Sequence, residues 1–209
     1  MSMWLKKLIE SKAKEPINTY TLDVVVPTTI LEFDLSRIIN NEELNNIIKQ
    51  YRKEFPKGLE PTSVFAWHSD WKTHLISTEF TNLVTAIESC LDKYYTHLEL
   101  VDLWINMYDE TGSAKRHNHR PAYLSCVYYV EAEEGSSSLI IDDNSEKNNK
   151  ITVDIKSGKL VVFPGYTYHS VPENNKKRTS IALNFFITSH NPTQEQIEER
   201  KKLCRGTDV

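Results

Sequence analysis

The chain contains little cysteine, and what it has is scattered. Among its 209 residues, only Cys90, Cys126 and Cys204 are cysteines, and no two of them form a Cys-x-x-Cys pair. An odd, widely spaced set argues against both a disulfide framework and a zinc ribbon. Free thiols suit a reducing compartment, so we expect a cytoplasmic protein.

Long apolar runs and an excess of positive charge are also missing. No stretch approaches the ~20 apolar residues that a membrane-spanning helix needs. Residues 1–16 lack the apolar core and small-residue cleavage site of a signal peptide. The formal net charge of −4 gives no broad basic footprint for nucleic acid. We therefore expect neither a membrane nor a nucleic acid as the partner.

The first half of the chain is predicted to be mainly helical. Apolar residues recur at helical spacing in residues 40–55 and 77–98, which predicts two amphipathic helices. Asn40 or Asn41 is expected to cap the first helix, and Thr78 or Thr81 the second. Residues 3–14 predict a weaker helix, and the Val- and Thr-rich residues 19–35 predict strands broken at Pro27.

From residue 98 the pattern changes to short strand-like runs separated by polar turns. Strands this closely spaced predict a sandwich, barrel or jelly roll. Residues 110–121 fall among the turns. We predict one α+β domain over residues 1–209. Its parts are a helical or mixed segment (1–97), a β core (about 98–188) and a charged C-terminal helix (191–204). The predicted strands cover residues 98–109, 122–132, 136–143, 150–155, 159–165, 166–172 and 178–188.

Two histidines stand one residue apart in "KRHNHRPAYLSCVYYV". Residues i and i+2 of an extended segment point to the same side, so His117 and His119 would aim both imidazoles at one point. Imidazole is a common ligand of zinc, iron, copper and nickel. A third ligand is needed, and His169 is the natural candidate because a Pro-Gly turn precedes its strand and folds the chain back. The pattern predicts a metal site.

Arg178 is the second unusual feature. In "RTSIALNFF" the residues Thr179, Ile181, Leu183 and Phe185 form one apolar face, whereas Arg178 and Ser180 share the other. A guanidinium and a hydroxyl two residues apart match a carboxylate, which Arg binds in bidentate fashion. A solvated charge at a strand edge is the simpler interpretation of Arg178 alone. The histidine nine residues upstream favours an anion-binding role.

These segments together resemble a known family. The motifs "HNHRPAYLSCVYYV" and "GKLVVFPGYTYHSVPENNKKRTSIALNFF", preceded by "WINMY", resemble the iron(II)- and 2-oxoglutarate-dependent oxygenases. The resemblance covers residues 62–188 and is closest to a group from phage and marine bacterial genomes. It implies a double-stranded β-helix (jelly-roll) core with N-terminal helices packed on one sheet, one Fe(II), and 2-oxoglutarate as cosubstrate. A phage-encoded member would act in the host cytoplasm.

The resemblance also implies roles for six residues. Three of them match metal ligands, and three match groups that hold the far carboxylate of 2-oxoglutarate. The implied metal ligands are His117, His119 and His169, and the implied cosubstrate contacts are Arg178, Ser180 and Tyr129. No catalytic residue beyond the metal ligands is expected.

The chain departs from the family in one respect, because most members have His-x-Asp where it has His117-x-His119. The site can be made of three histidines. Alternatively, one of the pair binds together with a carboxylate such as Asp142 or Asp143, or a halide or water takes the place of the carboxylate. The i, i+2 spacing favours both histidines, and a strand-end turn is the simpler interpretation of the two aspartates.

We therefore predict a non-haem iron dioxygenase that hydroxylates a small molecule or a side chain and releases succinate and CO2. One alternative is a cupin-like metal-binding protein, which needs no pair like Arg178 and Ser180. The other is a non-catalytic jelly-roll interaction or virion module. His68 and His74, in "WHSDWKTH", are expected to lie in a surface or pocket-lid segment and to bind no metal.

Overall fold

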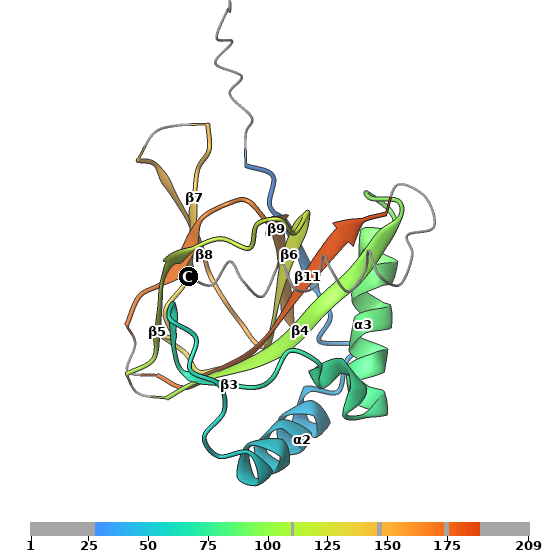
Figure 1. Cartoon of the computed structure of the whole chain (residues 1–209), viewed down its shortest axis with the longest axis vertical. Coiled ribbons are helices and arrows are strands. Elements are labelled where there is room, and N and C mark those ends of the chain that lie inside the picture. Colours follow the sequence, from blue (N-terminus) through green and yellow to red (C-terminus); the bar gives the residue numbers. More distant parts are fainter. Residues whose placement is uncertain (1–27, 110, 146–147, 174–175, 189–209) are drawn as a thin grey trace, which may run out of the picture.

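The structure is a computed structural model that describes residues 28–188, apart from residues 110, 146, 147, 174 and 175 (Figure 1). The helices expected over residues 3–14 and 191–204, and the part of the strand region before residue 28, lie outside the described residues. None of the described helices is both long and apolar enough to cross a membrane.

Two α-helices form where the periodicity predicts them. Helix α2 spans Asn41–Glu54, and the side chain of Asn40 caps it by accepting a hydrogen bond from the Glu43 N–H. Helix α3 spans Thr78–Leu91, and a 3₁₀ turn, η1 (Thr73–Leu75), precedes it. The predicted cap of α3 was wrong, because Ser77 occupies the N-cap position and its side chain makes no capping hydrogen bond.

The strands form two antiparallel sheets. The six-stranded sheet has the order β1-β9-β6-β11-β4-β3, and the five-stranded sheet has the order β2-β5-β10-β7-β8. The strand bounds are β1 Leu31–Asp34, β2 Val64–Phe65, β3 Trp67–His68, β4 Leu98–Tyr108, β5 Ser113–His117, β6 Leu124–Ala132, β7 Leu139–Asp142, β8 Lys150–Val153, β9 Lys159–Pro164, β10 His169–Val171 and β11 Arg178–Ile187. The architecture is the predicted α+β jelly roll.

Three layers result, because the six-stranded sheet is covered on both faces. Figure 1 shows α2 and α3 on one side of this sheet and the five-stranded sheet on the other. Apolar side chains of α2, α3 and the helix-facing side of β11 form the larger core, which includes Ile48, Leu83 and Leu183. A second core lies between the sheets and includes Ile141 and Phe163. The apolar face predicted for Thr179–Phe185 therefore packs under the helices.

The opposite face of the six-stranded sheet carries polar residues in register. Ser180 on β11 lies between Tyr129 on β6 and Asn106 on β4. Asn106 in turn pairs with His68 on β3. Side chains at paired positions point to the same side of a sheet, so these four residues form one row that faces the five-stranded sheet.

Candidate active site

His117 and His169 are neighbours across two strands of the five-stranded sheet. His117 ends β5 and His169 begins β10, and the two are paired in register. Nδ1 of His117 lies 2.7 Å from the carbonyl oxygen of Lys115, and Nδ1 of His169 lies 3.3 Å from that of Thr167. An Nδ1–H that donates to a carbonyl leaves Nε2 with its lone pair, which is the arrangement typical of metal-binding histidines.

His119 lies beyond the end of β5, in a loop held by backbone hydrogen bonds. Its N–H donates to the carbonyl of Gly165 over 2.8 Å, and its carbonyl accepts from Ala122 over 2.7 Å. Residues 113–117 form a strand although the turn-rich composition of 110–121 predicted none. His117 and His119 therefore lie on the same side because His117 ends a strand and His119 belongs to a loop that backbone hydrogen bonds hold in place.

The three imidazoles form one cluster. The ring centres of His117 and His169 are 4.3 Å apart. The ring centre of His119 lies 5.0 Å from that of His117 and 4.9 Å from that of His169. One nitrogen of each ring lies within 4.8 Å of the others. Among the described residues this is the only group of three or more His, Cys, Asp or Glu side chains arranged so that it could hold a metal ion.

Burial keeps these histidines neutral. It lowers the pKa of His169 to about 3, with a smaller contribution from His117. The pKa of His119 falls well below its ordinary value for the same reason, and that of His117 is also lowered by burial. Neutral imidazoles are the form that binds divalent metals.

The two aspartates considered as ligands have other partners. Asp142 ends β7 and forms ion pairs with Arg116 and Lys150. Asp143 accepts hydrogen bonds from Ser145 in a tight turn. Neither belongs to the cluster, so its described donor set is made of nitrogen atoms alone.

Arg178 points into the same cavity and lacks an anionic partner. It is 2% exposed, its guanidinium carbon lies 4.0 Å from the centre of the Tyr108 ring, and Nη1 donates to the Ser137 carbonyl over 2.8 Å. Nε is buried without a hydrogen-bond partner, and no ion pair to Arg178 occurs in the described part of the chain. A buried guanidinium is costly unless an anion compensates it.

Hydroxyl groups surround this guanidinium. Burial raises the pKa of Tyr129 well above its ordinary value and also raises the pKa of Tyr108, so both hydroxyls keep their protons. With the Ser180 hydroxyl they line the same cavity as Arg178. This donor set fits the far carboxylate of 2-oxoglutarate, and the imidazole cluster fits the metal.

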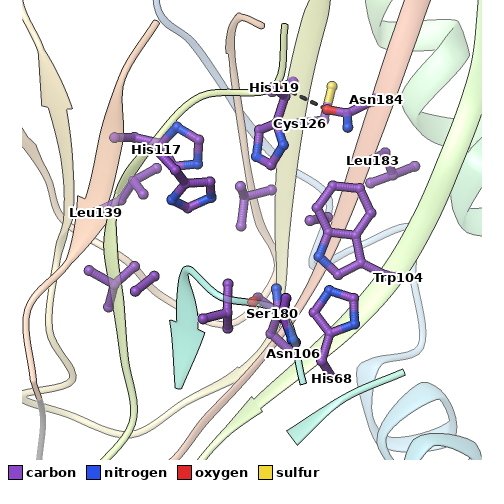
Figure 2. A pocket seen from close by; sticks show the side chains of 18 of the residues that line it. His68, Trp104, Asn106, His117, His119, Cys126, Leu139, Ser180, Leu183 and Asn184 are labelled. Atoms are coloured by element: carbon purple, nitrogen blue, oxygen red, sulfur yellow. Dashed lines mark hydrogen bonds between the residues drawn. The ribbon is translucent and has the colours of Figure 1, made fainter. Parts of the chain in front are cut away.

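Several cavity residues were missed by the sequence prediction. His68 is 1% exposed and lines the cavity together with Trp71, although the polar segment around it suggested a surface or lid position. Tyr108 also lines the cavity, at the end of the strand predicted over residues 98–109. Figure 2 shows Trp104 and His68 on the side of the cavity opposite His117.

A family model matches the β core of the chain. The family is described as "Putative 2OG-Fe(II) oxygenase", and the match covers residues 102–185. This range contains the histidine cluster together with Arg178 and Ser180. A comparison with curated protein sequences found no match.

Solved structures of prolyl hydroxylases share the fold. A prolyl-4-hydroxylase from Pseudomonas putida is 15% identical, with a TM-score of 0.61 over 78% of this chain and 94% of that one. The viral collagen prolyl hydroxylase of Paramecium Bursaria Chlorella virus-1, solved with 2-oxoglutarate, is also 15% identical, with a TM-score of 0.58 over 76% and 96%. A prolyl hydroxylase from Trichoplax adhaerens, in complex with a hypoxia inducible factor peptide fragment, is 13% identical, with a TM-score of 0.61 over 97% of each chain.

Identities this low establish the fold and nothing finer. The narrower likeness to phage and marine bacterial proteins stays a prediction. The chain is therefore similar to the 2OG-Fe(II) oxygenases in the family match over residues 102–185, and it shares its fold with the solved prolyl hydroxylases.

Proposed function

We propose that the protein is a 2-oxoglutarate-dependent iron(II) hydroxylase in which three histidines hold the metal. The proposed ligands are His117, His119 and His169. The observation that carries the proposal is that three neutral imidazoles and a buried guanidinium without an anion open onto one cavity. A cupin-like metal site, the alternative, has no need of that guanidinium.

The donor set also favours a dianionic cosubstrate. Three neutral ligands leave the full charge of the metal uncompensated, whereas a carboxylate ligand would neutralise part of it. Arg178 adds a second positive charge at the other end of the cosubstrate, where Ser180 and Tyr129 supply hydroxyl donors. Each carboxylate of 2-oxoglutarate therefore meets a cationic group.

Iron(II) and 2-oxoglutarate, when bound, would supply the chemistry with dioxygen as the oxidant: one oxygen atom would go to succinate as CO2 leaves, and the other to a substrate C–H bond. The protein binds and orients the reactants and excludes water. The backbone carbonyls of Lys115 and Thr167 hold two imidazoles in the tautomer that exposes Nε2. Trp104, whose ring centre lies 5.4 Å from that of His119, closes the cavity beside the cluster.

Release of succinate without an added substrate tests this function. The purified protein, supplied with Fe(II), ascorbate, 2-oxoglutarate and air, should convert 2-oxoglutarate to succinate slowly. His169→Ala should abolish the conversion, and Tyr166→Phe, an exposed change, should leave it intact. Equal rates in the wild type and in His169→Ala would contradict the proposal.

A further inference from the structure

A second polar pair lies in the cavity next to the cosubstrate residues. His68 and Asn106 continue the row that Tyr129 and Ser180 begin, because β3 pairs with β4 and β4 with β11. They are 1% and 6% exposed. Figure 2 shows the two side chains close together beneath Trp104, across the cavity from His117.

His68 presents a hydrogen-bond acceptor. Its Nδ1 lies 2.5 Å from the carbonyl oxygen of Ser69, so Nδ1–H is the donor in this contact and Nε2 carries the lone pair. Burial lowers the pKa of His68 to about 4, which keeps the ring neutral. No partner for Nε2 occurs among the hydrogen bonds of the residues that the structure describes.

Asn106 presents a second acceptor beside the first. Its Oδ1 is buried and has no hydrogen-bond partner in the described part of the chain. Buried polar atoms are nearly always paired in folded proteins, so the unpaired Oδ1 of Asn106 indicates a missing donor from a ligand, and Nε2 of the neighbouring His68 is a second acceptor for it. The cosubstrate cannot be that ligand, because the carboxylates and keto oxygen of 2-oxoglutarate are acceptors as well.

Aromatic rings join this pair to the histidine cluster. The rings of His68 and Trp104 are nearly parallel, 15° apart with centres separated by 5.9 Å, and Trp71 meets both edge-on. Trp104 also lies against His119. A flat group that hydrogen-bonds to His68 can therefore rest on the indole with its neighbouring carbon toward the cluster.

The charge of the cavity selects among such groups. Of the described residues that line it, none is acidic, and Arg178 is the one permanent cation. An ammonium or guanidinium substrate would lose its hydration without gaining a counter-charge. A neutral amide or hydroxyl provides the donor that both acceptors lack and carries no such cost.

We propose that His68 and Asn106 orient the substrate, and that the substrate presents a neutral N–H or O–H group beside the oxidised C–H bond, resting against Trp104. This inference depends on the proposed function, since it takes the rest of the cavity to hold metal and cosubstrate. It assigns a substrate class, neutral hydrogen-bond donors, and two positioning residues.

Three small probes test the substrate class. They are 2-pyrrolidinone, which has an N–H donor; N-methyl-2-pyrrolidinone, which has none; and pyrrolidinium, which is cationic. Their affinities for protein loaded with Zn(II) and 2-oxoglutarate are measured by saturation-transfer NMR. We expect 2-pyrrolidinone to bind about ten-fold more tightly than either of the other two.

Two variants test the residues. His68→Phe keeps a ring but removes the acceptor, so 2-pyrrolidinone should fall to the affinity of its N-methyl analogue. Asn106→Asp adds a negative charge and should shift the preference toward pyrrolidinium. The ratio of affinities is the readout, because a general loss of structure would weaken all three probes alike.

The inference is overturned if the wild type binds the two lactams equally, prefers the cation or binds no probe, or if His68→Phe keeps the lactam ratio. The NMR signals of 2-oxoglutarate in the same samples report whether the cosubstrate binds, independently of the probes. Cosubstrate binding without the lactam preference rejects this inference alone. Failure of 2-oxoglutarate to bind rejects the proposed function, and this inference with it.

Discussion

Arg178 carries a buried positive charge that has no anionic partner in the described part of the chain. Its charge is buried against Tyr108, one N–H donates to the Ser137 carbonyl, and Nε has no partner. An unpaired buried charge opposes folding, so its presence is explained by an anionic ligand that compensates it. The same charge should therefore lower the stability of the ligand-free protein and raise its affinity for 2-oxoglutarate.

Substitution of Arg178 by Met should therefore have two opposite effects. Metal-free Arg178→Met should be more stable than the wild type by about 1 kcal/mol, because an unpaired buried charge is replaced by an apolar chain of similar length. Its Kd for 2-oxoglutarate should rise about 100-fold. Urea unfolding and 2-oxoglutarate titration measure the two effects. Arg178→Lys, which keeps the charge, should lie between. Unchanged cosubstrate affinity in Arg178→Met would remove the basis for the anion site.

His68 gives the metal-free protein a specific dependence on pH. The folded-state pKa of about 4 is below the ordinary value of 6.5 because the ring is buried. The unfolded chain therefore takes up the proton first as the pH falls, and the stability due to neutral His68 is complete above about pH 6.5 and is lost toward pH 4. Between pH 7 and pH 5 this loss amounts to about 2 kcal/mol.

Urea unfolding of metal-free wild type and His68→Phe at several pH values tests this dependence. The variant should have the flatter curve over that range. The difference between the two proteins isolates His68 from the other histidines. Parallel curves would show that His68 takes up its proton in the folded state as readily as in the unfolded state.

Among the structural elements, the loop after β5 depends on Gly165. The Gly165 carbonyl accepts the His119 N–H, and the Gly165 N–H donates to the carbonyl of Tyr123 over 2.9 Å. A Cβ at position 165 would collide with the backbone carbonyl of Ala122. The loop that carries His119 can pack this closely only because residue 165 has no side chain.

Gly165→Ala should accordingly weaken metal binding without altering a ligand. We expect the Kd for Fe(II) to rise about ten-fold or more, which is the usual effect of disturbing a ligand's support. Gly158→Ala is the matched control, because Gly158 has a φ of +85° and a close contact with Ser36, outside the site. The control should lose stability and keep its metal affinity. A similar loss of affinity in both variants would contradict this role of Gly165.

Some of the helices and strands could be predicted from the sequence, and others could not. Helix α2 and the long strands β4 and β11 were predicted because periodic apolar residues decide them locally. Strand β5 was missed because "SAKRH" has one apolar residue, and the strand exists through pairing with β2 and β10. The histidine cluster was predictable from spacing and from the family resemblance. The place of His68 in the cavity was not predictable, because it comes from pairing with Asn106 across strands far apart in the chain.

The whole molecule holds its site between two sheets. The proposed ligands His117 and His169 belong to the five-stranded sheet, whereas Arg178, Ser180 and Tyr129 belong to the six-stranded sheet. A cosubstrate that contacts both the metal and Arg178 would link the two sheets. The metal and the cosubstrate should therefore stabilise the fold together more than the sum of their separate effects.

Anaerobic thermal unfolding measures this coupling. A ligand at 100 times its Kd stabilises the native state by about 2.7 kcal/mol. Fe(II) and 2-oxoglutarate together should raise Tm by more than the sum of their separate shifts, and Arg178→Met should lose the excess. Simple addition of the two shifts in the wild type would mean that the two ligands bind independently.

The most direct test of the central claim, that three imidazoles and Arg178 serve one metal–cosubstrate site, is an anaerobic titration with Fe(II) and 2-oxoglutarate followed by visible absorption. The wild type should develop the weak charge-transfer band of a chelated 2-oxo acid, His169→Ala should show none, and Arg178→Met should need about 100-fold more 2-oxoglutarate. A wild type without the band at saturating 2-oxoglutarate, or three proteins with the same titration curve, would contradict the account.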